Sequence, residues 1–291
     1  SSTPTTKYAN FWVGAWRRYR RNRLAMFGLV YAVIILLVAA LVPYLTPYEY
    51  DKIDVMIALQ PPSREHLMGT DELGRDILTR ILYGSRPMLA VGILTGIASL
   101  MIGVPIGILA GYLGGVFDWL VTRLIDTFSA LPWYLIVLYL VMVLSPSLEN
   151  LILAMIITGW VGSCRLMRSL AFSIREQDYI EAARALGAGS STILFRHMLP
   201  HLWKSLLVSS MLEMAAVLML LAELGYLNIF LGGGFKVEIS AETYYAYSDV
   251  PEWGALLANV QGWWRSYPWL AWAPGVFFFV SILAFNLLGE G

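Results

Sequence analysis

The sequence has a single cysteine, Cys164, among its 291 residues. One cysteine cannot form a disulfide within the chain, and it cannot supply a cysteine-type zinc site. Charged residues are also scarce, at 14% of the chain, whereas hydrophobic residues reach 58%. The mean hydropathy of +0.65 is too high for a soluble domain. The composition therefore indicates an integral membrane protein.

Motifs of catalysis are missing as well. The sequence has no Gly-x-x-x-x-Gly-Lys-Ser/Thr loop that could hold ATP phosphates. His197 and His201 have the spacing of helical metal ligands, but Pro200 lies between them and no third ligand follows. No serine has a convincing base and orienting acid beside it, and His66 stands alone in a polar loop, where we expect it to be solvated. We predict that the chain is not itself an enzyme, and that it binds no metal, cofactor or nucleic acid.

Long apolar runs are what the sequence does contain. A helix needs about 20 apolar residues to cross a bilayer, and six runs reach that length: 24–45, 88–111, 119–144, 148–168, 202–224 and 269–289. The first run is too long for a signal peptide and has no small-residue cleavage site behind it. We expect an all-α membrane protein with about six transmembrane helices, in which a basic segment, 1–23, precedes a membrane domain, 24–291.

The distribution of charge predicts the orientation of these helices. Segment 1–23 carries six Lys and Arg residues and no acid, which places the N-terminus in the cytoplasm. Its aromatic residues beside arginines suit an amphipathic helix on the inner membrane surface, or a simple anchor of orientation. Loops 46–87 and 225–268 then lie outside, where acids outnumber bases, and loop 172–200 lies inside.

Small and ionisable residues within the spans suggest how the helices pack. Glycines recur in steps of four, which predicts close contact with a neighbouring helix; they are Gly92, Gly96, Gly103, Gly107, Gly111 and Gly115. Arg123 and Asp126 are spaced to form an ion pair. Glu213 lies near the middle of its span and Glu223 near its outer end, so each is either part of a translocation path or a hydrogen-bonding contact between helices.

The polar stretch "DYIEAARALGAGSSTILFRHMLPHLW", residues 178–203, interrupts this apolar chain. We expect a short helix over 172–186, ended by Gly187 in the left-handed conformation. Ser190 or Ser191 would cap a second short helix that Pro200 stops. Alanines beside charged residues suit insertion into a groove of another protein, although a solvated loop is an equal alternative.

The stretch "EAARALG", followed after nine residues by "HMLP", resembles the EAA loop of ABC importer permeases. His197 stands where that pattern prefers isoleucine. In that family the loop is a coupling helix that docks on the ATP-hydrolysing subunit. The resemblance assigns this role to Asp178, Glu181, Ala182, Ala183, Arg184, Gly187, Leu199 and Pro200.

Two further stretches resemble the dipeptide/oligopeptide/nickel importer permeases. They are "MGTDELGRDILTRILYGSRPMLAVG", residues 68–92, and "PEWGALLAN", residues 251–259, leading into the last span. The resemblance implies that some outer residues contact a solute-binding protein or gate the outer mouth: Gly69, Thr70, Asp71, Gly74, Arg75, Asp76 and Trp253. For Trp253 and the other tryptophans of 251–272, an interfacial belt is the simpler interpretation.

The resemblance implies a type I ABC importer permease in a bacterial or archaeal cytoplasmic membrane. Its partners would be a second, homologous permease, two ABC ATPase subunits that carry ATP-Mg, an extracytoplasmic solute-binding protein and membrane lipid. Peptides lead as substrates, but nickel complexes, glutathione and oligosaccharides stay open. One segment departs from the family pattern, "FKVEISAETYYAYSDV", residues 235–250; it either contacts the binding protein or gate, or is a tolerated insertion.

The alternative is a secondary transporter or channel that works without ATPase partners. Such a protein should show an internal repeat or paired charges within the membrane, and neither is clear in this sequence.

Overall fold

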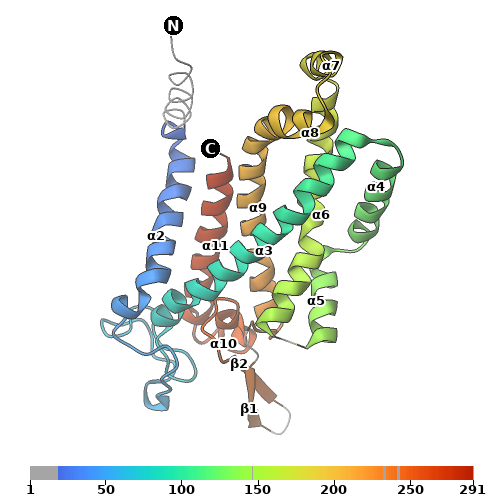
Figure 1. The fold of residues 1–291 in the computed structure, drawn as a ribbon. Coiled ribbons are helices and arrows are strands. Elements are labelled where there is room, and N and C mark those ends of the chain that lie inside the picture. The colour runs from blue at the N-terminus through green and yellow to red at the C-terminus, as the bar shows by residue number, and fades with distance from the viewer. Residues whose placement is uncertain (1–18, 146, 232–233, 241–242, 291) are drawn as a thin grey trace.

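The computed structural model describes residues 19–145, 147–231, 234–240 and 243–290. Most of the expected amphipathic segment 1–23 therefore lies outside the described residues. The described chain is a bundle of long helices with one small β-hairpin at one end (Figure 1). Residues 19–23 lie at the opposite end of the bundle, the end that also carries the polar segment around α7 (Asp178–Ala185).

The helices match the expected spans in number, with one break. Five helices are long and apolar enough to span a membrane: α2 (Arg23–Leu45), α3 (Ile77–Leu113), α6 (Leu148–Arg175), α11 (Trp269–Gly289) and the continuous helical stretch from α8 to α9 (Ser190–Tyr226). The expected span 119–144 is instead two helices, α4 (Gly115–Ser129) and α5 (Trp133–Leu144), bent by 78°. Pro132 lies in this break, where it cannot continue a helix already begun. The pair makes a sixth span if it is counted as one.

α3 begins earlier than the hydropathy of its residues predicts. We expected loop 46–87 to continue as far as the span 88–111, but α3 starts at Ile77. At this start the side chain of Asp76 accepts a hydrogen bond from the Thr79 amide at 2.7 Å. Such a carboxylate cap satisfies an amide that the first turn leaves unpaired. Pro87 and Pro105 lie inside the helix without ending it.

The glycine steps of α3 form a contact with α6, as predicted for three of the six glycines. A methyl group added at Gly103, Gly107 or Gly111 would lie within 2.5 Å of a backbone oxygen of α6. Gly92 makes the predicted close contact with a different helix, where it faces Met214 of α9. Gly96 and Gly115 face open space, so the prediction was wrong for those two positions. Because the two backbones touch, α3 and α6 pack as one unit.

The remaining helices surround this pair. α11 lies beside α2, where the Tyr31 and Ser281 hydroxyls bond at 2.5 Å, and beside α9 (Leu199–Tyr226) (Figure 1). The main apolar core gathers side chains of α3, α9 and α11, among them Ile81, Leu218 and Phe278. Many large apolar residues elsewhere on the helices are exposed, as expected for surfaces that face lipid.

Short elements close the end of the bundle opposite α7. They are η1 (Val55–Ile57), η3 (Ala255–Leu257), α10 (Val260–Trp263) and an antiparallel hairpin of β1 (Gly234–Ser240) and β2 (Thr243–Ser248). The hairpin falls on the segment that departs from the family pattern, and it projects away from the bundle (Figure 1).

Candidate coupling segment and outer-face cluster

One buried apolar side chain packs α7 against the bundle. The expected helix 172–186 is divided: α6 ends at Arg175, and α7 begins at Asp178. Ile180 is the one fully buried residue of α7, and it packs with Met167 of α6, Ile108 of α3 and Leu202 of α9. A displacement of α7 would therefore be transmitted through this cluster to three long helices.

Gly187 ends α7 as predicted, in the left-handed conformation with φ +81°. Its amide donates to the Arg184 carbonyl at 2.9 Å, and the Ala188 amide donates to the Ala183 carbonyl at 3.0 Å. This pair of bonds is the Schellman motif, which satisfies carbonyls that the end of a helix leaves free. The sequence thus encodes a sharp end to α7.

The helix that follows differs from the prediction. Neither Ser190 nor Ser191 caps it: Gly189 holds the N-cap position, and no side chain bonds to the first amides of α8 (Ser190–Thr192). Helical bonding then runs without interruption through η2 (Ile193–Met198), a π-helical turn, into α9, although the ribbon changes direction there (Figure 1). Pro200 lacks an amide donor, and a widened turn before a proline accommodates that loss.

Tyr112, at the end of α3, connects α3 to both sides of this segment. Its hydroxyl donates to Ser190 at 3.2 Å, and the guanidinium of Arg184 lies 5.3 Å from the centre of its ring. Its carbonyl accepts a bond from Arg175 at 3.4 Å. The sequence alone gave no signal for this residue, because its partners lie 63 to 78 residues away.

The outer surface of the segment is uncovered. Glu181, Ala182 and Arg184 are exposed, while Ala183 and Leu199 are half-buried. Two large apolar side chains that we had not singled out are exposed beside them: Leu186 at 88% and Phe195 at 72%. Exposed apolar side chains among charges, on the polar segment of a membrane protein, are typical of a surface that binds another protein.

At the other end of the bundle, the predicted contact residues are buried. Gly69, Thr70, Asp71, Gly74, Arg75, Asp76 and Trp253 all have buried side chains or backbones. Asp71 accepts hydrogen bonds from the Leu73 and Arg75 amides and from Nε of Arg75 at 2.7 Å. Asp76 also pairs with Nδ1 of His66 at 2.9 Å, so our expectation that His66 is solvated was wrong. This geometry supports a role in holding the outer loops together.

Trp253 does not sit in an interfacial belt. Its indole donates to the Ile81 carbonyl at 2.6 Å and packs edge-on against Phe278, with ring centres 5.5 Å apart. It is 2% exposed. A tryptophan buried in this way stabilises the joint between α3, α11 and the last outer loop.

The same cluster fixes the hairpin. Glu252 accepts bonds from the Leu231 amide at 2.7 Å and the Ser248 hydroxyl at 3.3 Å. Burial raises the pKa of the Glu252 carboxyl to about 7, and these bonds and the charge of Arg80 lower the pKa only in part. Arg75 lies 5.6 Å from the centre of the Tyr247 ring.

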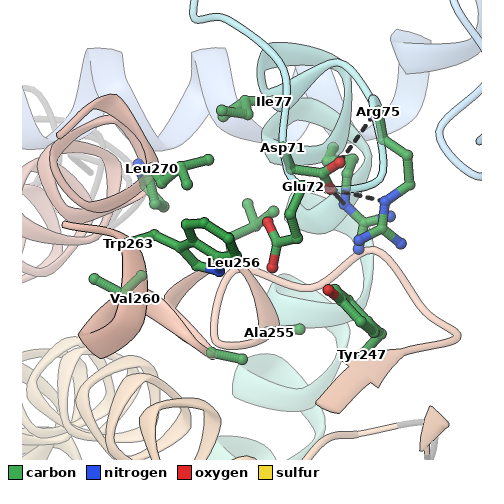
Figure 2. Close-up of a pocket in the computed structure, with 13 residues that line it drawn as sticks. Asp71, Glu72, Arg75, Ile77, Tyr247, Ala255, Leu256, Val260, Trp263 and Leu270 are labelled. Carbon is green, nitrogen blue, oxygen red and sulfur yellow. Dashed lines mark hydrogen bonds and ion pairs between the residues drawn. The ribbon is translucent and has the colours of Figure 1, made fainter. Parts of the chain in front are cut away.

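A small cavity of about 20 Å³ lies between these groups, and Glu72 points into it (Figure 2). Burial, and then the charge of Asp71, raise the pKa of the Glu72 carboxyl. Arg80 Nε and Trp263 Nε1 line the same space and have no hydrogen-bond partner among the described residues. A space of this size, with polar groups around it, suits a single water molecule.

The ionisable residues that we singled out within the spans belong neither to the segment around α7 nor to the buried cluster around Asp71. Oε2 of Glu213 accepts a bond from the Ser163 hydroxyl at 3.2 Å. Glu223 is half-buried and lies ten residues further along α9, about 15 Å away along the axis. Arg123 and Asp126 form the expected pair at 3.5 Å, with side chains 63% and 55% exposed.

The two histidines of the polar segment do not converge on a common point. His201 Nδ1 lies 2.8 Å from the His197 carbonyl, and its ring stacks on Tyr179. In the described ranges, no three His, Cys, Asp or Glu side chains gather as a metal site.

Comparison with known proteins places these features in a family. The model of the binding-protein-dependent transport system inner membrane component matches residues 103–290. The model of the N-terminal TM domain of oligopeptide transport permease C matches residues 10–62.

Curated relatives align along nearly the whole chain. The dipeptide transport system permease protein DppC of Alkalihalophilus pseudofirmus is 35% identical over 96% of this chain and 87% of its own length. The oligopeptide transport system permease protein OppC of Bacillus subtilis is 33% identical over 98% and 88%. The glutathione transport system permease protein GsiD of Pectobacterium atrosepticum is 34% identical over 96% and 88%.

A solved structure shares the fold. The MetNI methionine ABC transporter, in an inward-facing conformation, contains a chain that superposes with a TM-score of 0.54. The match covers 74% of this chain and 94% of that one, at 17% sequence identity. The helices are therefore arranged in the type I importer permease fold.

Proposed function

Because this chain belongs to the family of binding-protein-dependent transport system inner membrane components, we propose that it works as one permease of an ATP-driven importer and that α7 docks on an ATPase subunit. The observation that carries this proposal is the exposed surface of α7 and η2. Charged Glu181 and Arg184 flank it, and the apolar side chains of Leu186 and Phe195 extend from it. Ile180 anchors the surface in the bundle.

The remaining partners follow from the family. A second permease of similar fold would complete the translocation path, two ATPase subunits would hold ATP-Mg, and an external binding protein would deliver the solute. This chain itself would then catalyse no reaction. Closure of the ATPases around ATP would displace α7, and the spans would shift between two conformations, as expected for an element biased by ligand binding on another chain.

The orientation is part of the same proposal. Arg20, Arg21 and Arg23 lie at the end of the bundle that carries α7. By the positive-inside rule that end faces the cytoplasm, where ATPases act. The hairpin and the cluster around Asp71 would then face outward. There the exposed parts of the hairpin, rather than the buried residues beneath it, would meet the binding protein.

The solute we propose is peptide-like. The curated relatives bear the names of dipeptide, oligopeptide and glutathione permeases, all of which denote short peptides. This family membership disfavours the alternative of a secondary transporter, and the two functions differ in whether ATPases accompany the chain.

Purification in a gentle detergent tests the docking proposal. The tagged chain, isolated from its native host, should retain two P-loop ATPases and a second permease, identified by mass spectrometry. Leu186→Asp should lose the ATPases, because it places a charge on the docking surface. Met56→Asp is the matched control, since Met56 is 91% exposed at the opposite end. If the unsubstituted chain purifies without ATPases, or if Leu186→Asp retains them fully, the proposal is wrong.

A further inference from the structure

A second cavity lies within the membrane-spanning part of the bundle. It has a volume of about 450 Å³, is open on one side, and is bordered by the break between α4 and α5, by one face of α6 and by α9. Thr158, Val161, Gly162 and Arg165 line it from α6 at helical spacing. Its volume falls within the range of small-molecule sites, about 300–1,000 Å³.

The local sequence explains why this space is open. The chain turns by 78° between α4 and α5, so the two helices do not cover α6 along its whole length. Gly162 faces the gap, and a methyl group added there would meet no atom within 4 Å. A larger residue at position 162 would fill the space.

Glu213 lines this cavity from α9. A carboxylate inside a membrane is costly and is kept where it has a partner or a function. The Ser163 hydroxyl donates a hydrogen bond to Oε2 of Glu213 at 3.2 Å, whereas a carboxylate can accept about four such bonds. Gly159 leaves room for Ser99 and Glu213, because an added methyl group would lie 2.6 Å from Oγ of Ser99 and 3.2 Å from Oε1 of Glu213. Across the described ranges, no basic side chain forms an ion pair with Glu213.

The one basic residue that lines the cavity bonds to a residue other than Glu213. Arg165 donates a short hydrogen bond to the hydroxyl of Ser129, at the end of α4. The two charged residues therefore line one cavity without neutralising each other. This leaves the Glu213 carboxylate free to bind a cation that comes from outside the chain.

We propose that this cavity is a solute-binding station in the translocation path and that Glu213 binds a protonated amine of the solute. An ammonium group supplies three donors, which matches the unused acceptor capacity of a carboxylate bound to one hydroxyl. Arg165 supplies an opposite charge in the same space, so a solute with both an ammonium and an anionic group fits it best. The proposal rests on the proposed function in one respect, namely that the cavity belongs to the path.

Two other occupants are conceivable on chemical grounds, and each predicts a different result. A lipid acyl chain or a side chain of the second permease would fill the cavity and exclude water. A solute station must be reached by water and must favour cations over anions.

Thiol labelling measures both properties without knowledge of the solute. Cys164 is buried and is removed as Cys164→Ser. Gly162→Cys then places a thiol in the cavity, and Gly275→Cys places one on α11, outside it; neither substitution meets an atom within 4 Å. The purified protein, with whichever subunits it retains, is treated with 2-aminoethyl or 2-sulfonatoethyl methanethiosulfonate in the absence of ATP and binding protein. The rate of thiol modification is measured from the increase in mass of this chain.

The quantity compared is the ratio of the labelling rate with the cationic reagent to the rate with the anionic reagent. We expect this ratio to be at least tenfold higher for Gly162→Cys than for Gly275→Cys. Adding Glu213→Gln should reduce that preference tenfold or more, and at Gly275→Cys it should change nothing. An unreactive thiol at position 162, or a preference that survives Glu213→Gln, would overturn the proposal. Because labelling needs no ATP hydrolysis, its failure is separable from a failure of the ATPase partners to copurify.

Discussion

The two ends of the bundle differ in whether their charged side chains are buried and paired or exposed to solvent. At the hairpin end, Asp71 and Arg75 pair at 2.7 Å with side chains 7% and 8% exposed. At the α7 end, Glu181 and Arg184 stand in solvent. Buried charges that have partners within the chain position its own loops, whereas exposed charges on a loosely anchored helix are available to another protein. The difference separates residues that hold the fold from residues that bind a partner.

The strongest test of this contrast removes one charge from each end. Asp71→Ala leaves Arg75 and Arg80 without their shared carboxylate, and breaking a buried pair costs about 3–5 kcal/mol. Glu181→Ala should leave stability unchanged but weaken retention of the ATPases. Thermal unfolding in detergent measures the first effect and copurification the second. Equal melting temperatures for the two variants would contradict the comparison.

A smaller effect is expected from the proton on Glu252. Its folded pKa, about 7, lies above the usual value, so the folded protein holds a proton there that the unfolded chain releases. Stability therefore falls as pH rises from about 4.5 to about 7, by on the order of 3 kcal/mol. Glu252→Gln should flatten the dependence of melting temperature on pH between about 5 and 7.

Asp249→Asn is the control for that measurement, because Asp249 is exposed in the same loop. It should leave the slope as it is. A slope that is equally steep with Glu252→Gln would mean that another group titrates.

At the α7 end, backbone conformation should matter more than charge for coupling. Gly187 has φ +81°, which costs a residue with a side chain about 1–2 kcal/mol. Gly187→Val should therefore distort the end of α7 and lower solute uptake per ATP hydrolysed. Gly189 has φ −70° and ψ 158°, which valine adopts readily, so Gly189→Val should keep normal coupling. Equal coupling in both variants would show that the end of α7 is not critical.

The smallest effect is predicted for the exposed pair of α4. Arg123 and Asp126 are both more than half exposed, and pairs of this kind contribute about 0–1 kcal/mol. Arg123→Ala should shift the free energy of unfolding by less than about 0.5 kcal/mol, measured by thermal unfolding in detergent. A larger loss would indicate that the pair is covered in the assembled complex.

Local signals in the sequence predicted the spans and the end of α7. Apolar run length gives span positions, and Gly187 fits the only backbone conformation that closes α7 in this way. The bend near Pro132 could be recognised only with hindsight, since proline is tolerated within α3 at Pro87 and Pro105. Whether a proline bends or ends a helix depends on neighbouring helices that the sequence does not specify.

The burial of the outer cluster was beyond the sequence for another reason. We expected His66 to be solvated, and Asp71 and Arg75 to contact a binding protein or gate the outer mouth, because charge and polarity are typical of a surface. Asp71 and His66 pair with residues nearby in the sequence, Arg75 and Asp76. The ring beside Arg75 comes from Tyr247, 172 positions away, and that contact depends on the tertiary fold. The cavity beside Glu213 likewise requires the bend between α4 and α5, so only its carboxylate, not its shape, was visible in the sequence.

The exposure of Leu186 and Phe195 also has a consequence for how such a chain is produced. Until a partner covers them, two large apolar side chains stand at a polar end of the bundle, where chaperones and proteases recognise unassembled subunits. A surplus of this chain over its partners would be degraded or would aggregate. The cell must therefore synthesise this chain and its partner subunits in matching amounts, so that Leu186 and Phe195 are covered.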